Sequence, residues 1–431
     1  MKAIVCLPVD FAQNSLGLPA LLGEEVDSAS VLYHTVSRLT LTDDFEVVLL
    51  FTESQRAEKD VALAREMLSG LDCHYMTSAA ADVVNREFLR RGRLWSLQAW
   101  RGGMGWTSYW DEAGRPAALL EAAERFDADA VGLITPESVY VDPKLTGEIL
   151  AWHRNHLRSA RVTVADVAVG LAPAFFQRDV LQGFAGEGLT FAAVMSYKPT
   201  HPQRDLATTD AHFEADIRLR LVPRRFTLHS LRQLELAREL SRLGASPRAA
   251  SALEVVETYR THPELWPGAV PEKIEIEATS ALGAAPFYLK DFLEHRRATE
   301  MPIETFTEIV ASIGPHRDLL LTLEGLGDPL LHPRAPQLVA AAREAGFLGV
   351  HLATFGGRLD EELFSALQEA RLDVLSVHVG ASSEEGYKRL FGSAGEGGGG
   401  EGGFRAWPKR WRRRLPCARP QAFPGRLSLL K

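Results

Sequence analysis

The sequence predicts an α/β protein with two domains, and three observations lead to this prediction. The chain has 431 residues, enough for two or three domains that each bury a core. Short apolar runs of strand length alternate with amphipathic helical stretches, which favours parallel sheets covered by helices. Proline-containing segments between residues 246 and 268 separate two such series. We therefore expect a first domain at residues 1–225, a helical linker at 226–270 and a second domain at 271–392.

Composition narrows the class of protein. Apolar residues make up 46% of the chain and charged residues 24%, values typical of globular domains, and the net charge of −8 favours neither nucleic acid nor membrane as a partner. The three cysteines, Cys6, Cys73 and Cys417, are too far apart for a disulfide framework, as expected in a reducing cytoplasm. The first residues have the pattern of a strand, and no apolar run is long enough to span a membrane. We expect a cytoplasmic protein.

Each element of the first domain follows from apolar periodicity. Strands are predicted at Ala3–Leu7, Val47–Phe51 and Ala130–Ile134, and a further strand-like run at Ile217–Leu221. Helices are predicted at Ser30–Leu39, Val61–Leu68 and Arg115–Phe126, and a further helix at Leu228–Leu243 in the linker. This alternation indicates a doubly wound sheet.

The opening of this domain resembles that of nucleotidyltransferases and related glycosyltransferase-A folds. The resemblance rests on residues 15–22 (SLGLPALL), followed by Ser30-Val31-Leu32 and Thr35-Val36. It implies a nucleotide and metal site, for which Asp10, Glu137 and Asp142 are the candidate acids. The chain departs from the family after the first strand, because residues 8–11 (PVDF) replace the glycine-rich basic turn that cradles a triphosphate. The alternative is a scaffold retained without nucleotide binding.

Two other features of the first domain each have two interpretations. Five aromatic residues lie around the loop at 101–105 (RGGMG), and they could stack a sugar or base or could cap the sheet: Trp95, Trp100, Trp106, Tyr109 and Trp110. His153 and His156 are spaced for half a metal site on a helix, but surface polarity explains them as well.

The second domain consists of four predicted strand–helix units. The strands are Lys273–Ala278, Leu319–Glu324, Gly349–Thr354 and Asp373–Val379, and the helices are Ile303–Ile313, Arg334–Ala345 and Asp360–Ala370. This repetition is typical of a (β/α) barrel, and four units make a partial one.

The strand ends of this domain resemble the radical SAM family. Residues 327–333 (GDPLLHP) match the Gly-Glu-Pro turn with Asp in place of Glu, Thr354-Phe355-Gly356-Gly357 matches a Thr-Asn-Gly segment, and residues 384–391 match a later helix. The domain order is similar to that of spiro-SPASM proteins. The resemblance implies that Gly325, Gly327, Asp328, Pro329, Thr354 and Ser376 line a site for S-adenosylmethionine.

The same resemblance implies a [4Fe–4S] cluster whose ligands this chain lacks. The three family cysteine positions correspond to Ala281, Ala285 and Tyr288. Iron–sulfur clusters are held by thiolates, and alanine offers no ligand, so we expect the radical chemistry to be lost. The Gly-Asp-Pro turn could still bind the amino group of S-adenosylmethionine through Asp328, or it could be purely structural.

The chain is expected to lose its regular pattern after residue 392. Residues 393–431 are rich in glycine and then in arginine, with Trp407 and Trp411 interleaved. This tail could bind nucleic acid or an acidic surface, be disordered, or result from a frame change. No SPASM module follows, and the half barrel would need a partner to complete it.

We expect a radical SAM/SPASM-like protein with a degenerate site that binds a small molecule or peptide without catalysis, or a truncated copy. One alternative is a peptide- or protein-modifying maturase with atypical cluster ligands. The other is a nucleotidyl- or glycosyltransferase that acts through residues 1–225.

Overall fold

The structure, a computed structural model, divides into two compact units, Met1–Val270 and Pro271–Lys431. It describes residues 1–14, 18–52, 54, 56–79, 114–157, 161–186, 191, 212–220, 222, 224–265, 271, 273–282, 298–313, 319–378, 385–386 and 389. The aromatic loop at 95–110, the positions Ala285 and Tyr288, and the tail at 393–431 lie outside the described residues. Each unit is described by itself.

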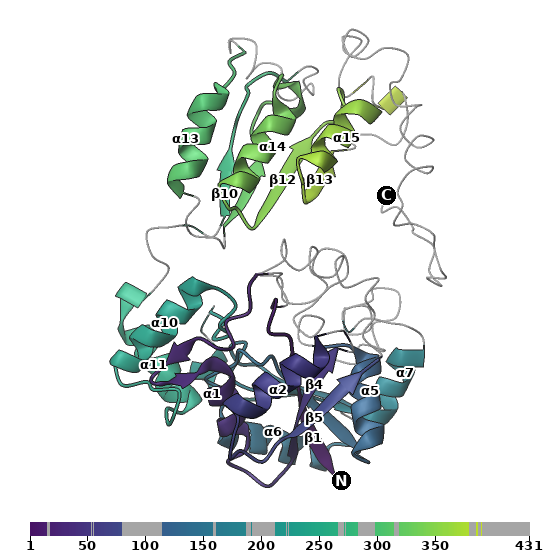
Figure 1. The fold of residues 1–431 in the computed structure, drawn as a ribbon, viewed down its shortest axis with the longest axis vertical. Coiled ribbons are helices and arrows are strands. Elements are labelled where there is room, and N and C mark those ends of the chain that lie inside the picture. Colours follow the sequence, from purple (N-terminus) through teal and green to yellow (C-terminus); the bar gives the residue numbers. More distant parts are fainter. Residues whose placement is uncertain are drawn as a thin grey trace. The chain divides into compact units, whose positions relative to one another are not determined.

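A seven-stranded mixed sheet forms the centre of the first unit (Figure 1). In spatial order the strands are β5 (His74–Ser78), β4 (Glu46–Thr52), β1 (Ala3–Val9), β6 (Ala130–Leu133), β8 (Ala174–Gln177), β7 (Val162–Ala165) and β9 (His212–Phe213). β1 pairs in parallel with both β4 and β6, and β4 pairs in parallel with β5. β8 runs antiparallel to both β6 and β7.

The antiparallel strand departs from the all-parallel sheet expected from the sequence. β7 and β8 are joined by eight residues without a helix, and such a short connection reverses the chain, whereas parallel neighbours need a crossover. On one side of β6 the strands pair in parallel. On the other side β8 is antiparallel to its two neighbours, and β7 and β9 again pair in parallel.

Helices cover both faces of this sheet. They are α1 (Val31–Leu39), α2 (Ala57–Met67), α5 (Pro116–Arg125), α6 (Pro143–Asn155), α7 (Arg178–Gly186), α9 (Ile217–Arg220), α10 (Leu231–Arg242) and α11 (Ala252–Thr261). A hairpin of β2 (Glu25–Val26) and β3 (Ala29–Ser30) precedes α1, and a 3₁₀ turn, η4 (Pro263–Leu265), follows α11.

The residues of β1 alternate between two separate cores, as a doubly wound sheet requires. Val5 and Leu7 pack in one core with apolar residues of α1, α6, α10 and α11. Ile4 and Cys6 pack in the other core with residues of α5 and α7. Burial raises the pKa of the Cys6 thiol far above its ordinary value, so this cysteine is an inert core residue.

The segment predicted as a linker belongs to the first core. Leu234, Leu240, Val255 and Tyr259 are buried in the same cluster as β1. Both helices begin with a capping box, at Ser230 for α10 and Ser251 for α11. The first unit therefore extends through α11.

Residues 217–220 form the short helix α9, so the strand predicted at Ile217–Leu221 was wrong. The apolar alternation of this run reflects one turn of helix with Leu219 buried and Ile217 exposed. Asp216 starts the turn by accepting the backbone N–H of Arg218 at 2.9 Å.

The second unit contains a four-stranded parallel sheet in the order β10 (Lys273–Ile276), β11 (Leu320–Leu323), β12 (Gly349–Thr354) and β13 (Val374–Val377). Its helices are α13 (Ile303–Ile313), α14 (Ala335–Glu344) and α15 (Glu361–Glu369), with a 3₁₀ turn, η7 (Pro329–Leu331), after β11. All three helices cover the same face of the sheet (Figure 1). Right-handed crossovers that always step in one direction produce this arrangement. The four predicted strands of this domain and the three helices predicted between them are thus present.

In the part of the chain that the structure describes, no helix is both long and apolar enough to cross a membrane.

Candidate functional site

The strand order of the first unit reverses between β1 and β6. After β1 the chain moves through α1 to β4 and then to β5 on one side, and later returns through α5 to β6 on the other side of β1. At such a switch point, the loops that follow the two adjacent strands separate and leave a crevice outside their carboxyl ends. The two loops are residues 10–14 and 134–138, and they are the candidate ligand-binding segments of this unit.

The loop after β1 is shaped by its own side chains. Asp10 Oδ1 accepts the backbone N–H groups of Ala12 (2.8 Å) and Gln13 (3.2 Å). Asn14 Oδ1 accepts the N–H of Leu18 at 3.1 Å. Because Asp10 already orients these backbone donors, residues 12 and 13 do not form the phosphate cradle of the nucleotidyltransferase family.

The loop after β6 carries a buried polar group. Glu137 and Ser138 are 4% and 0% exposed, and the hydroxyl groups of Thr135 and Ser138 lie 3.0 Å apart. The segment that leads into α10 lies alongside, since the N–H of Leu228 donates to the Glu137 carbonyl at 3.0 Å. This contact places His229 beside Glu137.

Three segments that are far apart in sequence meet at this edge of the sheet. Asn14 Nδ2 donates to the His229 carbonyl at 2.6 Å, and His229 Nε2 lies 3.7 Å from Glu137 Oε2. We refer to Asn14, Thr135, Glu137, Ser138 and His229 as the edge cluster; each is at most 4% exposed. A buried carboxylate beside a buried imidazole is costly unless it is paired, which makes this edge a candidate site.

Asp60 adds a second acid near Asp10. It lies on α2, its carboxylate is 3.6 Å from Arg56, and burial raises its pKa above the ordinary value, with a further contribution from Asp10. The β1 side of the switch point therefore carries two neighbouring carboxylates.

Asp142 has a structural role. Its Oδ1 accepts the N–H of Leu145 at 3.0 Å and so caps α6, and its Oδ2 accepts the N–H of Ala252 at 2.7 Å, in the first turn of α11. Asp10, Glu137 and Asp142 do not come together as a metal-binding group, and among the described residues no three His, Cys, Asp or Glu side chains do.

His153 and His156 also separate. His153 is fully buried and its Nδ1 lies 2.6 Å from Thr163 Oγ1, whereas His156 stacks on Trp152 with ring centroids 4.0 Å apart. Burial lowers the pKa of His153 to about 4. These two histidines serve the packing of α6.

The strand ends of the second unit are tied together by Asp328, which is 4% exposed. Its Oδ1 accepts the N–H of Leu330 at 3.0 Å, and its Oδ2 accepts the N–H of Phe355 at 3.1 Å. The Thr354 hydroxyl lies 2.7 Å from Oδ1 and 2.9 Å from Oδ2. Burial raises the pKa of Asp328, opposed by these hydrogen bonds.

The two glycines of the same turn allow close contact with β10. A Cβ at Gly325 would lie 2.6 Å from the Glu277 side chain, and one at Gly327 would overlap the Thr279 carbonyl oxygen. Glu277 Oε1 accepts the N–H groups of Leu326 (2.8 Å) and Gly327 (3.0 Å). Pro329 is buried at the start of η7. The turn thus joins the loops that follow β10, β11 and β12.

Ala281 lies in the loop after β10, and its carbonyl accepts the N–H of Asp328 at 2.7 Å. Ser376 lies on β13, and its hydroxyl is 2.7 Å from His351 Nε2 on β12. Ala281 offers no side-chain ligand for iron, so the residue present at this position does not fit a [4Fe–4S] cluster.

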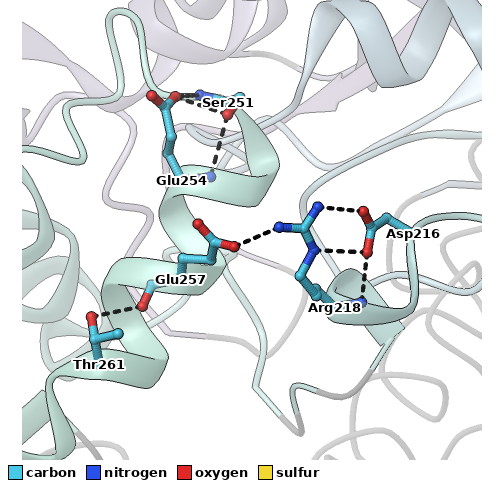
Figure 2. Close-up of polar contacts among 6 residues, drawn as sticks. All are labelled: Asp216, Arg218, Ser251, Glu254, Glu257 and Thr261. Atoms are coloured by element: carbon cyan, nitrogen blue, oxygen red, sulfur yellow. Dashed lines mark hydrogen bonds and ion pairs between the residues drawn. The ribbon is translucent and has the colours of Figure 1, made fainter.

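A third polar group lies on the surface of the first unit (Figure 2). The Arg218 guanidinium donates to Asp216 at 2.6 and 3.0 Å and to Glu257 of α11 at 2.8 Å. These bonds from Arg218 lower the pKa of Asp216 to about 2. Because Arg218 uses its donors on both carboxylates, this group connects α9 to α11 and has few donors left for a ligand.

No protein-family model matches the chain, and no curated protein matches it in sequence. Among solved structures, a cytidylyltransferase from Leptospira borgpetersenii matches 61% of this chain and 95% of its own, at 13% identity and a TM-score of 0.41. The 2-C-methyl-D-erythritol 4-phosphate cytidylyltransferase from Thermus thermophilus matches 56% of this chain and 98% of its own, at 14% identity and a TM-score of 0.30.

BtrN in complex with AdoMet and 2-DOIA matches 30% of this chain and 56% of its own, at 22% identity and a TM-score of 0.24. All of these TM-scores are low, so the fold rests on the topology described above. Two of these three neighbours are cytidylyltransferases, and the chain is a mixed α/β protein whose two larger sheets contain parallel strands.

Proposed function

We propose that the first unit is a nucleotide-binding domain of the nucleotidyltransferase type, with its ligand at the switch point between β1 and β6. The observation that carries this proposal is the strand-order reversal at β1 and β6, where Asp10 follows β1 and Glu137 follows β6. Open sheets of this kind bind ligands outside the carboxyl ends of their strands. The proposal takes up the transferase alternative reached from the sequence.

Asp10 is the residue best placed to meet a magnesium-bound phosphate. It directly follows β1, and Mg²⁺ usually binds through one or two carboxylates together with substrate phosphates. Asp142 is left out of the site because its carboxylate caps α6 and holds α11. Magnesium, when bound, would neutralise the negative charge that the phosphates bring close to Asp10.

Isothermal titration of the full chain with each of the four ribonucleoside triphosphates and Mg²⁺ tests the proposal. We expect saturable binding of at least one of them, and a loss of about tenfold in affinity for Asp10→Ala, since a charge-assisted contact is removed. The matched control is Asp43→Ala. Asp43 is exposed and lies just before β4, at the amino ends of the parallel strands and so away from the proposed site. The proposal fails when no triphosphate binds, or when both variants bind like the parent.

For the second unit, we infer that the Gly-Asp-Pro turn remains from a degenerate S-adenosylmethionine site. Its present role is to hold together the loops that follow β10, β11 and β12. The supporting observation is that Leu330, Thr354 and Phe355 all donate to the Asp328 carboxylate. Such a carboxylate has little capacity left for the amino group of a ligand.

Two measurements on the full chain test this inference. After anaerobic incubation with iron and sulfide, we expect no broad visible absorbance of an iron–sulfur cluster, because Ala281 provides no thiolate. In equilibrium dialysis we expect no retention of S-adenosylmethionine. Stoichiometric iron bound with sulfide, or saturable retention that Asp328→Ala abolishes, would overturn the inference.

A further inference from the structure

The Glu137–His229 pair differs from the other buried histidine sites of the first unit. The nitrogen atoms Nδ1 and Nε2 of His229 are both buried and have no hydrogen-bond partner among the described residues. The other buried histidines have at least one partner for the ring: His34 Nε2 lies 2.6 Å from the Val26 carbonyl, and His153 Nδ1 lies 2.6 Å from Thr163 Oγ1, although His153 Nε2 is also buried without a partner among the described residues. His229 is only 1% exposed, so water on the protein surface does not satisfy it.

The separation of the two side chains is too long for a direct hydrogen bond. His229 Nε2 lies 3.7 Å from Glu137 Oε2, whereas N–H···O bonds are 2.7–3.2 Å long. Buried polar atoms in native proteins are almost always paired, so unpaired ones call for an explanation. Thr227 Oγ1, two residues before His229, is a further buried atom without a partner in the described part of the chain.

The chemistry of the pair selects the kind of group that it would bind. A carboxylate accepts hydrogen bonds only, while an imidazole donates from one nitrogen and accepts at the other. A hydroxyl group can donate to Glu137 and accept from His229 at the same time. A phosphate would place its negative charge beside the Glu137 carboxylate in a buried site, at a large electrostatic cost.

We propose that Glu137 and His229 bind a ribose hydroxyl group of the nucleotide ligand. This inference rests on the function proposed above and names the part of the ligand that faces β6, while Asp10 faces the phosphates on the β1 side. Asn14 donates to the His229 carbonyl, so the loop after β1 holds the backbone that carries the His229 ring.

Binding of matched nucleotide pairs tests the inference. The full chain is titrated with the ribonucleoside triphosphate that it binds most tightly, and with the 2′-deoxy and 3′-deoxy forms of that nucleotide. We expect at least one deoxy form to bind about 10- to 100-fold more weakly, because the loss of a hydroxyl leaves buried polar groups unpaired.

Substitutions of Glu137 and His229 then test whether these two side chains cause the preference for the ribonucleotide. We expect Glu137→Gln and His229→Asn to weaken ribonucleotide binding while leaving binding of the deoxy form nearly unchanged, which reduces the preference to about threefold or less. His153→Asn, a change at a buried histidine of α6, is the matched control and should keep the parent preference. Circular dichroism checks that each variant is folded. If His229→Asn does not fold, the test rests on Glu137→Gln, which preserves the shape of the side chain.

The possible outcomes separate the two proposals. Equal binding of ribo- and deoxyribonucleotides by the parent, or an unchanged preference in Glu137→Gln, overturns the ribose inference and leaves nucleotide binding in place. A parent protein that binds no nucleotide overturns both.

Discussion

Arg38 shows how a single buried charge can fasten several elements. It lies on α1, is 3% exposed, and donates to the carbonyl groups of Val141, Pro247 and Ala250. Burial lowers its pKa, and the nearby Asp142 opposes that shift. The guanidinium thereby joins α1 to the start of α6 and to the segment before α11.

We expect Arg38→Met to destabilise the first unit by about 3 kcal/mol or more, since it removes the donors of three buried carbonyl groups. Urea unfolding followed by circular dichroism measures the change. The exposed Arg125→Met, in the last turn of α5, is the control and should shift stability by no more than about 0.5 kcal/mol. Equal effects of the two substitutions would contradict the role of Arg38.

His153 predicts how the stability of the first unit depends on pH. Burial lowers its pKa to about 4 from the ordinary value of 6.5. Between these values the unfolded chain binds a proton that the folded protein does not, so the free energy of unfolding rises with pH across this window. The depressed pKa of His153 makes the free energy of unfolding about 3 kcal/mol larger above pH 6.5 than below pH 4. This contribution is fully present above pH 6.5 and is lost as the pH falls toward 4.

Urea unfolding at pH 7 and pH 5 measures this dependence. We expect the difference between the two pH values to shrink in His153→Gln, which does not titrate in this range. A parent protein whose stability is the same at both pH values would show that His153 is not held neutral by burial.

At the scale of elements, the turn between β11 and η7 depends on a glycine. A Cβ at Gly327 would overlap the Thr279 carbonyl oxygen and lie 2.7 Å from the Thr279 carbonyl carbon. Both are backbone atoms of the loop after β10, so they cannot move aside as a flexible side chain would.

We therefore expect Gly327→Ala to destabilise the second unit by about 3 kcal/mol or more. The matched control is Gly357→Ala, since a Cβ there meets no atom within 4 Å and the residue is exposed. Its effect should stay within about 0.5 kcal/mol. Thermal unfolding of both variants measures the difference, and a stable Gly327→Ala protein would show that the turn is not closely packed on β10.

The elements with strong periodicity were predictable from the sequence. The strands β1, β4 and β6 and the helix α1 are apolar or amphipathic throughout, and the strand–helix units of the second domain are equally regular. β5 (HYMTS) is mostly polar, and β7 (VTVA) and β8 (AFFQ) contain no apolar run longer than three residues, so periodicity did not reveal them.

The candidate site was only partly predictable. Asp10 and Glu137 come just after predicted strands, and this position can be recognised in the sequence. His229 reaches the edge cluster through contacts with Asn14 and Glu137, which are 215 and 92 positions away, and no local pattern encodes them. Asp142 could have been recognised as a helix cap, because Asp followed by Pro is a common helix start.

At the scale of the whole molecule, two α/β units place their polar side chains at the carboxyl ends of parallel strands. In the second unit those side chains bind one another through Asp328 and Glu277. In the first unit the edge cluster contains a histidine whose ring has no hydrogen-bond partner among the described residues. This contrast is the reason why we propose ligand binding for the first unit and not for the second.

Hydrogen–deuterium exchange of the full chain, with and without the best-binding nucleotide and Mg²⁺, tests that assignment most directly. We predict slower exchange in the segments 10–14, 135–138 and 227–230, which meet at the switch point, and unchanged exchange in the segment 325–332 of the second unit. Protection confined to the second unit, or no protection anywhere under saturating nucleotide, would contradict it.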